Sequence, residues 1–119
     1  MTGRQIETKL KVETVCRLFD VDPKWAVAVA MTESSLGEDQ LSPTGCKGVF
    51  QMSRVAMEDL RQAMENKDDD LVDIVCGVAF LRLLLRRHGS LEAATKRFCD
   101  PKEKDRYWAK AKGYMEQLE

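Results

Sequence analysis

The chain has 119 residues, of which 44% are hydrophobic and 33% are charged, and its formal net charge is −1. This length and composition predict one compact domain, residues 1–119, with a substantial core. We expect no cofactor. The balanced charge argues against nucleic acid as a partner, because binding a polyanion needs clustered Lys and Arg. No apolar run reaches the roughly 18–20 residues of a membrane span, so we expect no membrane insertion.

The N-terminus and the cysteines bear on the cellular compartment. The first 13 residues are polar and lack the apolar core of a secretory signal. We therefore expect a cytoplasmic protein, a mature or trimmed chain, or export by another route. Cys16, Cys46, Cys76 and Cys99 form no CxxC pair, so we expect no zinc site. Four cysteines permit three disulfide pairings, but the missing signal favours free thiols.

Two helices are predicted in the first third of the chain. Apolar residues from Ile6 and Leu10 to Phe19 have helical spacing, which predicts an amphipathic helix over residues 5–19. Asp22-Pro23 is typical of an N-cap followed by proline at the first helical position. The next helix therefore runs from Pro23 to about Ser34. It is apolar on nearly all sides and should be the central buried helix.

The stretch 37–52 is rich in Gly, Ser and Pro, which predicts a short β-hairpin or an irregular loop that starts with a turn or left-handed cap at Gly37. Ser53 is a candidate cap for a third helix. Residues 66–70 lack the alternating ligands of a calcium loop, so we expect a solvated loop in which Asp70 caps a fourth helix.

The last three helices follow from their capping signals. The fourth should end with Arg86, Arg87 and His88 just before Gly89. Ser90 should cap a short fifth helix, and Asp100-Pro101 with Glu103 should start the sixth. The prediction is a mainly α domain of about six helices with one irregular loop or small β-hairpin after the second.

Glu33 is the strongest candidate for chemistry. The single histidine, His88, sits in a helix-ending basic cluster, and the sequence contains no phosphate-binding loop. Glu33 ends an apolar helix, where desolvation and the helix C-terminus both raise a carboxyl pKa. A carboxylic acid protonated near neutral pH is the general acid that glycosidic cleavage needs. The alternative is an exposed glutamate with no catalytic role.

Three strings resemble the lytic transglycosylase family of the lysozyme-like superfamily. They are E-S-S at 33–35, S-P-T-G-C-K-G-V-F-Q-M at 42–52 and D-I-V-C-G-V-A-F-L-R-L-L-L at 73–85. The first two are similar to the family's catalytic glutamate, serine, G-A-x-G and glutamine, with Cys46 in place of alanine. The third is similar to its N-I-x-x-G-x-x-Y-L-x-x-L-L helix, with Asp73 in place of asparagine.

The resemblance implies a lysozyme-like α-domain that cleaves the β-1,4 bond between N-acetylmuramic acid and N-acetylglucosamine in peptidoglycan. Glu33 would protonate the bridging oxygen and then act as base toward the muramic acid 6-hydroxyl, giving a 1,6-anhydro product. The resemblance implies no metal. The implied substrate-binding residues are Ser34, Ser42, Gly48, Val49, Gln51 and Phe98.

The family's Y-N-x-G motif is replaced here by Phe98-Cys99-Asp100-Pro101, so the tyrosine hydroxyl that helps to position the glutamate is absent from that place. Tyr107 and Tyr114 are alternative sources of a hydroxyl. Two other functions stay open. One is a hydrolase similar to goose-type lysozymes, with Glu38 or Asp39 as the second carboxylate. The other is a non-catalytic module that binds glycan or protein.

The implied substrate lies in the periplasm or outside the cell. A phage-encoded endolysin or virion-associated enzyme, or a trimmed domain of a secreted protein, would reconcile this substrate with the missing signal. We expect a bacteriolytic monomer whose partner is the glycan strand of peptidoglycan.

Overall fold

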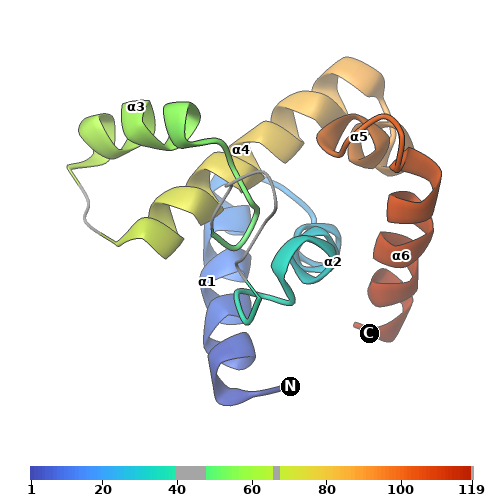
Figure 1. Cartoon of the computed structure of the whole chain (residues 1–119), viewed down its shortest axis with the longest axis horizontal. Coiled ribbons are helices and arrows are strands. Elements are labelled where there is room, and N and C mark those ends of the chain that lie inside the picture. The colour runs from blue at the N-terminus through green and yellow to red at the C-terminus, as the bar shows by residue number, and fades with distance from the viewer. Residues whose placement is uncertain (40–47, 66–67, 119) are drawn as a thin grey trace.

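The structure is a computed structural model that describes residues 1–39, 48–65 and 68–118. The described residues form six α-helices and no strand (Figure 1). The helices are α1 (Gly3–Phe19), α2 (Pro23–Ser34), α3 (Arg54–Met64), α4 (Asp69–His88), α5 (Leu91–Phe98) and α6 (Lys104–Gln117). The mainly α fold class is thereby confirmed. The possible hairpin cannot be located, because residues 40–47 lie outside the described residues.

Helix α2 is the central element of the core. All residues from Trp25 to Ala30 are buried, which confirms the prediction of a central apolar helix. Helix α2 packs against α1 on one side and α6 on the other (Figure 1). The buried indole of Trp25 donates a hydrogen bond of 2.7 Å to the Thr95 hydroxyl, which ties α2 to α5.

Several helix ends follow the predicted caps. The Asp22 carboxylate accepts from the Lys24 amide with Pro23 at the first position of α2, and Gly89 closes α4 with a left-handed backbone. The Ser90 hydroxyl accepts from the Ala93 amide at the start of α5. Local capping chemistry therefore determines these boundaries.

Helix α2 ends at Ser34 as predicted, and Gly37, with φ of 85°, lies in the turn that follows the C-cap Ser35. Two other boundaries differ from prediction. Helix α4 is capped by Asp68, whose carboxylate accepts from the Leu71 amide, so Asp70 lies inside the helix. The Asp100 carboxylate accepts from the Lys102 amide in a turn that precedes α6. At α4 consecutive aspartates offer equivalent capping groups, whereas the predicted capping box of α6 is not formed, because the N-cap Glu103 makes no side-chain cap hydrogen bond.

The buried face of α1 is narrower than the sequence predicted. Ile6 and Leu10 are 50% and 59% exposed, while Thr8, Val12 and Val15 are buried. Helix α1 packs against α2 and α4 through this second set. Within the described residues, no helix is long and apolar enough to cross a membrane.

The segment that follows the undescribed residues packs tightly on α4. Val49 and Phe50 are fully buried, and Gly77 of α4 faces the Phe50 ring. A Cβ atom at position 77 would lie 2.4 Å from Phe50 Cγ, so only glycine allows this approach. The segment 48–52 is thereby fixed beside the C-terminal end of α2.

Candidate active site

Glu33 lies in the last turn of α2 and is partly exposed. It lines a hollow of about 290 Å³ between α2 and the first half of α6. The hollow is lined by Thr32, Glu33, Glu103, Arg106, Tyr107 and Lys110. A carboxylic acid here is accessible to a ligand while its helix shields it from much of the solvent.

The hydroxyl of Tyr107 donates a hydrogen bond of 3.0 Å to Oε1 of Glu33. Helices α2 and α6 pack against each other extensively, so both partners lie on a rigid frame. Of the two tyrosines that could supply a hydroxyl, the structure places Tyr107 at Glu33. Burial and the neighbouring carboxylate raise the pKa of Tyr107 well above its ordinary value, so the hydroxyl stays protonated and remains a donor.

The pKa of Glu33 is raised from 4.5 to about 7, mainly because burial disfavours the charged carboxylate. The hydrogen bond from Tyr107 lowers the pKa, and the negative charge of Asp73 raises it. The carboxyl is therefore close to half protonated at neutral pH, which suits a group that must both give and take a proton.

Ser34 is buried, and its hydroxyl is engaged by the chain itself. It donates to the Val49 carbonyl at 2.6 Å and accepts from the Gly37 amide at 3.0 Å. Ser34 and Val49, both predicted to bind substrate, therefore lie in the interior and connect the end of α2 to the segment 48–52. Their role in this geometry is to hold the residues that flank Glu33.

Asp73 was not among the predicted site residues, although it stands where the family's helix motif has asparagine. It is fully buried on α4, and its two carboxylate oxygens accept from the backbone amides of Phe50 and Met52. The signal in the sequence was a single carboxylate inside the apolar run of the fourth helix. Burial raises the pKa of Asp73 to about 6, against the lowering effect of these amides.

Gly48 has a φ of 108° and lies against Asp73. A Cβ atom at position 48 would lie 2.5 Å from Asp73 Oδ2, so the close approach that requires glycine is to this carboxylate. The Gln51 side-chain amide donates to the Gly48 carbonyl at 2.8 Å. Gly48 and Gln51 thus belong to one turn, fixed on α4.

Phe98 is half-buried at the end of α5 and contacts two other aromatic rings. Its centroid lies 6.4 Å from that of Phe50 in an edge-to-face arrangement and 5.7 Å from that of Phe80. Such pairs add roughly 0.5–1.5 kcal/mol beyond their burial. Phe98 therefore packs the segment 48–52 against α4 and α5. Ser42, the remaining predicted residue, lies outside the described residues.

Of the other carboxylates near α2, Glu38 and Asp39 lie after the helix end, whereas Glu103 lies beside Glu33. Glu38 accepts a hydrogen bond from the Thr2 hydroxyl at the start of α1, and Asp39 is exposed. Glu103 lines the Glu33 hollow, and its carboxylate is 3.7 Å from the Arg106 guanidinium. Across residues 1–39, 48–65 and 68–118, no group of three or more His, Cys, Asp or Glu side chains is arranged to hold a metal.

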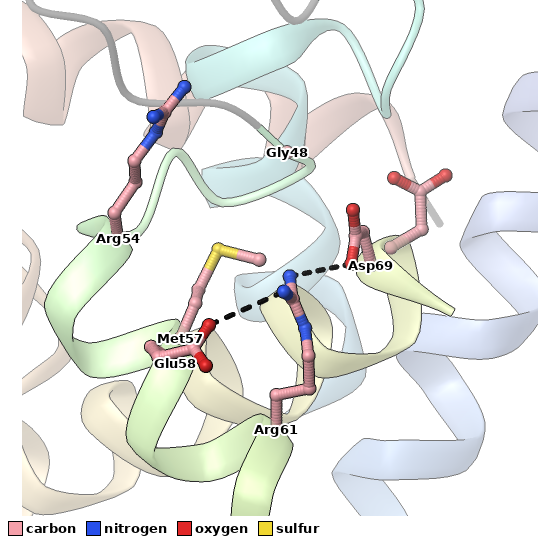
Figure 2. A pocket seen from close by; sticks show the side chains of 7 residues that line it. Gly48, Arg54, Met57, Glu58, Arg61 and Asp69 are labelled. Atoms are coloured by element: carbon pink, nitrogen blue, oxygen red, sulfur yellow. Dashed lines mark hydrogen bonds and ion pairs between the residues drawn. The ribbon is translucent and has the colours of Figure 1, made fainter. Parts of the chain in front are cut away.

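A second hollow, of about 390 Å³, lies between α3 and the start of α4 (Figure 2). Figure 2 shows Arg61 reaching between two acidic side chains, 3.4 Å from Glu58 and 2.6 Å from Asp69. Gly48 also lines this hollow. Arg61 is paired with Glu58 and Asp69 there, in contrast to Glu33, which accepts a hydrogen bond from the neutral hydroxyl of Tyr107.

Comparison with known proteins identifies the family. The sequence model described as "Transglycosylase SLT domain" matches residues 16–99, more than half of the chain. The match contains Glu33, Asp73 and the segment 48–52. Comparisons with curated proteins and with solved structures found no match. The chain therefore belongs to the transglycosylase SLT domain family, the lytic transglycosylase-like branch of the lysozyme-like superfamily, whose general function is cleavage of peptidoglycan in the cell wall.

Proposed function

We propose that this protein cleaves the β-1,4 bond between N-acetylmuramic acid and N-acetylglucosamine, with Glu33 as both general acid and general base. The observation that carries the proposal is the environment of Glu33. It is partly exposed in a hollow, its pKa lies near 7, and the Tyr107 hydroxyl fixes one of its oxygens.

In the first step Glu33 acts as an acid. Because the Tyr107 hydroxyl donates to Oε1, Oε2 is the oxygen that carries the carboxyl proton in this mechanism. Transfer of this proton to the bridging oxygen breaks its bond to C1 of the muramic acid and leaves an oxocarbenium-like sugar. The Tyr107 hydrogen bond then stabilises the carboxylate that forms.

In the second step the same carboxylate acts as a base. It takes the proton of the muramic acid 6-hydroxyl while that oxygen bonds to C1, so Glu33 is protonated again and a 1,6-anhydro sugar results. One carboxylate serves both steps. The use of a single carboxylate fits a site in which the other buried acid, Asp73, accepts hydrogen bonds from backbone amides.

We propose that the glycan lies across the C-terminal end of α2. Gln51, Phe98 and Ser42 remain the predicted contacts with the sugar, and the backbone of Gly48 and Val49 supports them. Arg106 and Lys110 give the hollow cationic groups beside Glu33. Such groups suit a substrate whose muramic acid carries stem peptides with carboxylates. We expect a monomer that reaches the wall as a phage lytic enzyme or as part of an exported protein.

Glu103 supports hydrolysis as a second candidate function, because it lines the same hollow as Glu33. A hydrolase would use this second carboxylate to activate water. Glu103→Gln would then abolish cleavage, whereas the transglycosylase mechanism retains most of it.

The experiment is release of soluble fragments from purified peptidoglycan by wild type, Glu33→Gln and Glu7→Gln. Glu7 is an exposed α1 glutamate and provides the matched control. We expect loss of at least about 100-fold for Glu33→Gln, the usual scale of a general acid, and no change for Glu7→Gln. Equal release by wild type and Glu33→Gln would contradict the proposal and favour a non-catalytic binding module.

A further inference from the structure

The charge of Asp73 has consequences for Glu33 that the family resemblance does not supply, because the family motif has a neutral asparagine at this position. Asp73 is fully buried, so its carboxylate must be satisfied by the chain itself. The partners are backbone amides of the segment 48–52, which comes from a different part of the chain.

Asp73 accepts hydrogen bonds from the amides of Phe50 and Met52, the residues on either side of Gln51. Gln51 has a φ of 54°, in the left-handed region that is unfavourable for residues other than glycine. Because the Asp73 carboxylate accepts from the amides of Phe50 and Met52, it holds the backbone of Gln51 in this conformation. Asp73 therefore fixes the direction of Gln51, a predicted sugar contact.

The same segment is connected to Glu33 by Ser34. The Ser34 hydroxyl donates to the Val49 carbonyl, and Ser34 is the residue directly after Glu33. A continuous path of hydrogen bonds thus runs from Asp73 on α4, through the segment 48–52, to the end of α2. The close fit between Gly48 and Asp73 leaves no space for this segment to move toward α4.

We propose that Asp73 is a positioning residue for the reaction: its buried carboxylate fixes the segment 48–52, and its negative charge adds to the burial that favours the protonated form of Glu33. This inference rests on the proposed role of Glu33. The backbone N–H groups that bond to Asp73 favour its charged form, and its negative charge raises the pKa of Glu33.

The other groups that face this pair do not replace that charge. Tyr107 is neutral and lowers the pKa of Glu33. Arg106 and Lys110, on the rim of the hollow, are exposed cations, and exposed Glu103 lies 3.7 Å from Arg106. Cys99 is a half-buried thiol whose pKa is raised, so it is uncharged at neutral pH. Asp70 raises the pKa of Asp73, from the first turn of α4.

The test is the titration of Glu33 by NMR in protein labelled with ¹³C at glutamate carboxyls, with the resonance assigned by its loss in Glu33→Gln. Asp73→Asn removes the buried charge and keeps the side-chain shape. We expect the pKa of Glu33 to fall by roughly half a unit or more. Asp70→Asn removes one charge from the same helix and should leave that pKa unchanged. Equal pKa values of Glu33 in wild type and Asp73→Asn would overturn the proposal.

A measurement on wild type keeps the test independent of whether Asp73→Asn folds. The amide protons of Phe50 and Met52 should shift together as pH is changed, with one midpoint below that of Glu33. Amide shifts that do not share a midpoint would overturn the positioning role. These titrations need no substrate, so a protein that fails to cleave peptidoglycan contradicts the proposed function and leaves the coupling between Asp73 and Glu33 intact.

Discussion

The hydroxyl of Tyr107 lies 3.0 Å from Oε1 of Glu33, although 74 residues separate the two in the sequence. This contact supplies the hydroxyl that is missing at Phe98, from the first half of α6 and not from the end of α5. It opposes the effect of burial on Glu33, so the pKa of about 7 is the result of two opposed effects.

Tyr107→Phe should lower the rate of peptidoglycan cleavage by roughly 10-fold or more, since hydrogen bonds to charged groups contribute about 1.5–3 kcal/mol. It should also raise the pKa of Glu33 further, because the bond that favours the carboxylate is lost. The decline in rate above pH 7 would then move to higher pH. Tyr114→Phe, two turns later on the same helix, is the matched control and should keep the wild-type profile. Identical pH–rate profiles for Tyr107→Phe and wild type would show that the hydroxyl does not act on Glu33.

Glu33→Gln should stabilise the protein at neutral and alkaline pH. The pKa of Glu33 is about 7 in the folded state, against a reference value of 4.5 for the unfolded chain. The folded state therefore binds the proton more tightly. The ionisation of Glu33 therefore destabilises the folded state. This destabilisation is absent below pH 4.5, grows between pH 4.5 and 7, and is complete above pH 7. At pH 8 we expect the variant to be more stable by about 1–3 kcal/mol. Urea unfolding at several pH values measures this, and a difference between the two proteins that is constant with pH would contradict it.

Gly77→Ala should destabilise the fold by about 1–3 kcal/mol, because its methyl group would overlap the Phe50 ring. Gly113→Ala provides the comparison, since a Cβ atom there has no neighbour within 4 Å in α6. That variant should gain roughly 0.5–1 kcal/mol from helix propensity. Thermal unfolding of both variants measures this difference in stability. If Gly77→Ala is as stable as Gly113→Ala, Phe50 does not pack on α4 as described.

Ser34→Ala should cost about 1–3 kcal/mol, since the Val49 carbonyl and the Gly37 amide would stay buried without this partner. Thr14→Ala also loses a hydroxyl that bonds to a backbone carbonyl, at an exposed position of α1. Its unfolding free energy should stay within about 0.5 kcal/mol of wild type. Comparable losses in the two variants would mean that Ser34 does not connect α2 to the segment 48–52.

The sequence was sufficient for the elements whose ends carry one unambiguous signal. Asp22-Pro23, Gly89 and Ser90 each offer a single capping geometry, and the structure has it. The sequence could not predict which aspartate caps α4, because consecutive aspartates are chemically equivalent and packing selects Asp68 over Asp70.

The candidate site was predictable where it is local. Glu33 stands out because a carboxylate ends an apolar helix, and the raised pKa follows from that position. Its contact with Tyr107 depends on how α6 packs on α2, which periodicity cannot specify when two tyrosines lie seven residues apart. The burial of Asp73 is likewise tertiary, because its partners are amides of a segment more than 20 residues earlier.

The most direct measurement of the central claim is the mass of the fragments that the purified protein releases from peptidoglycan. We expect disaccharide-peptides that end in 1,6-anhydro-N-acetylmuramic acid, each lighter by one water than the hydrolysis product, and none from Glu33→Gln. Fragments that all carry reducing ends, or release that continues in Glu33→Gln, would contradict it.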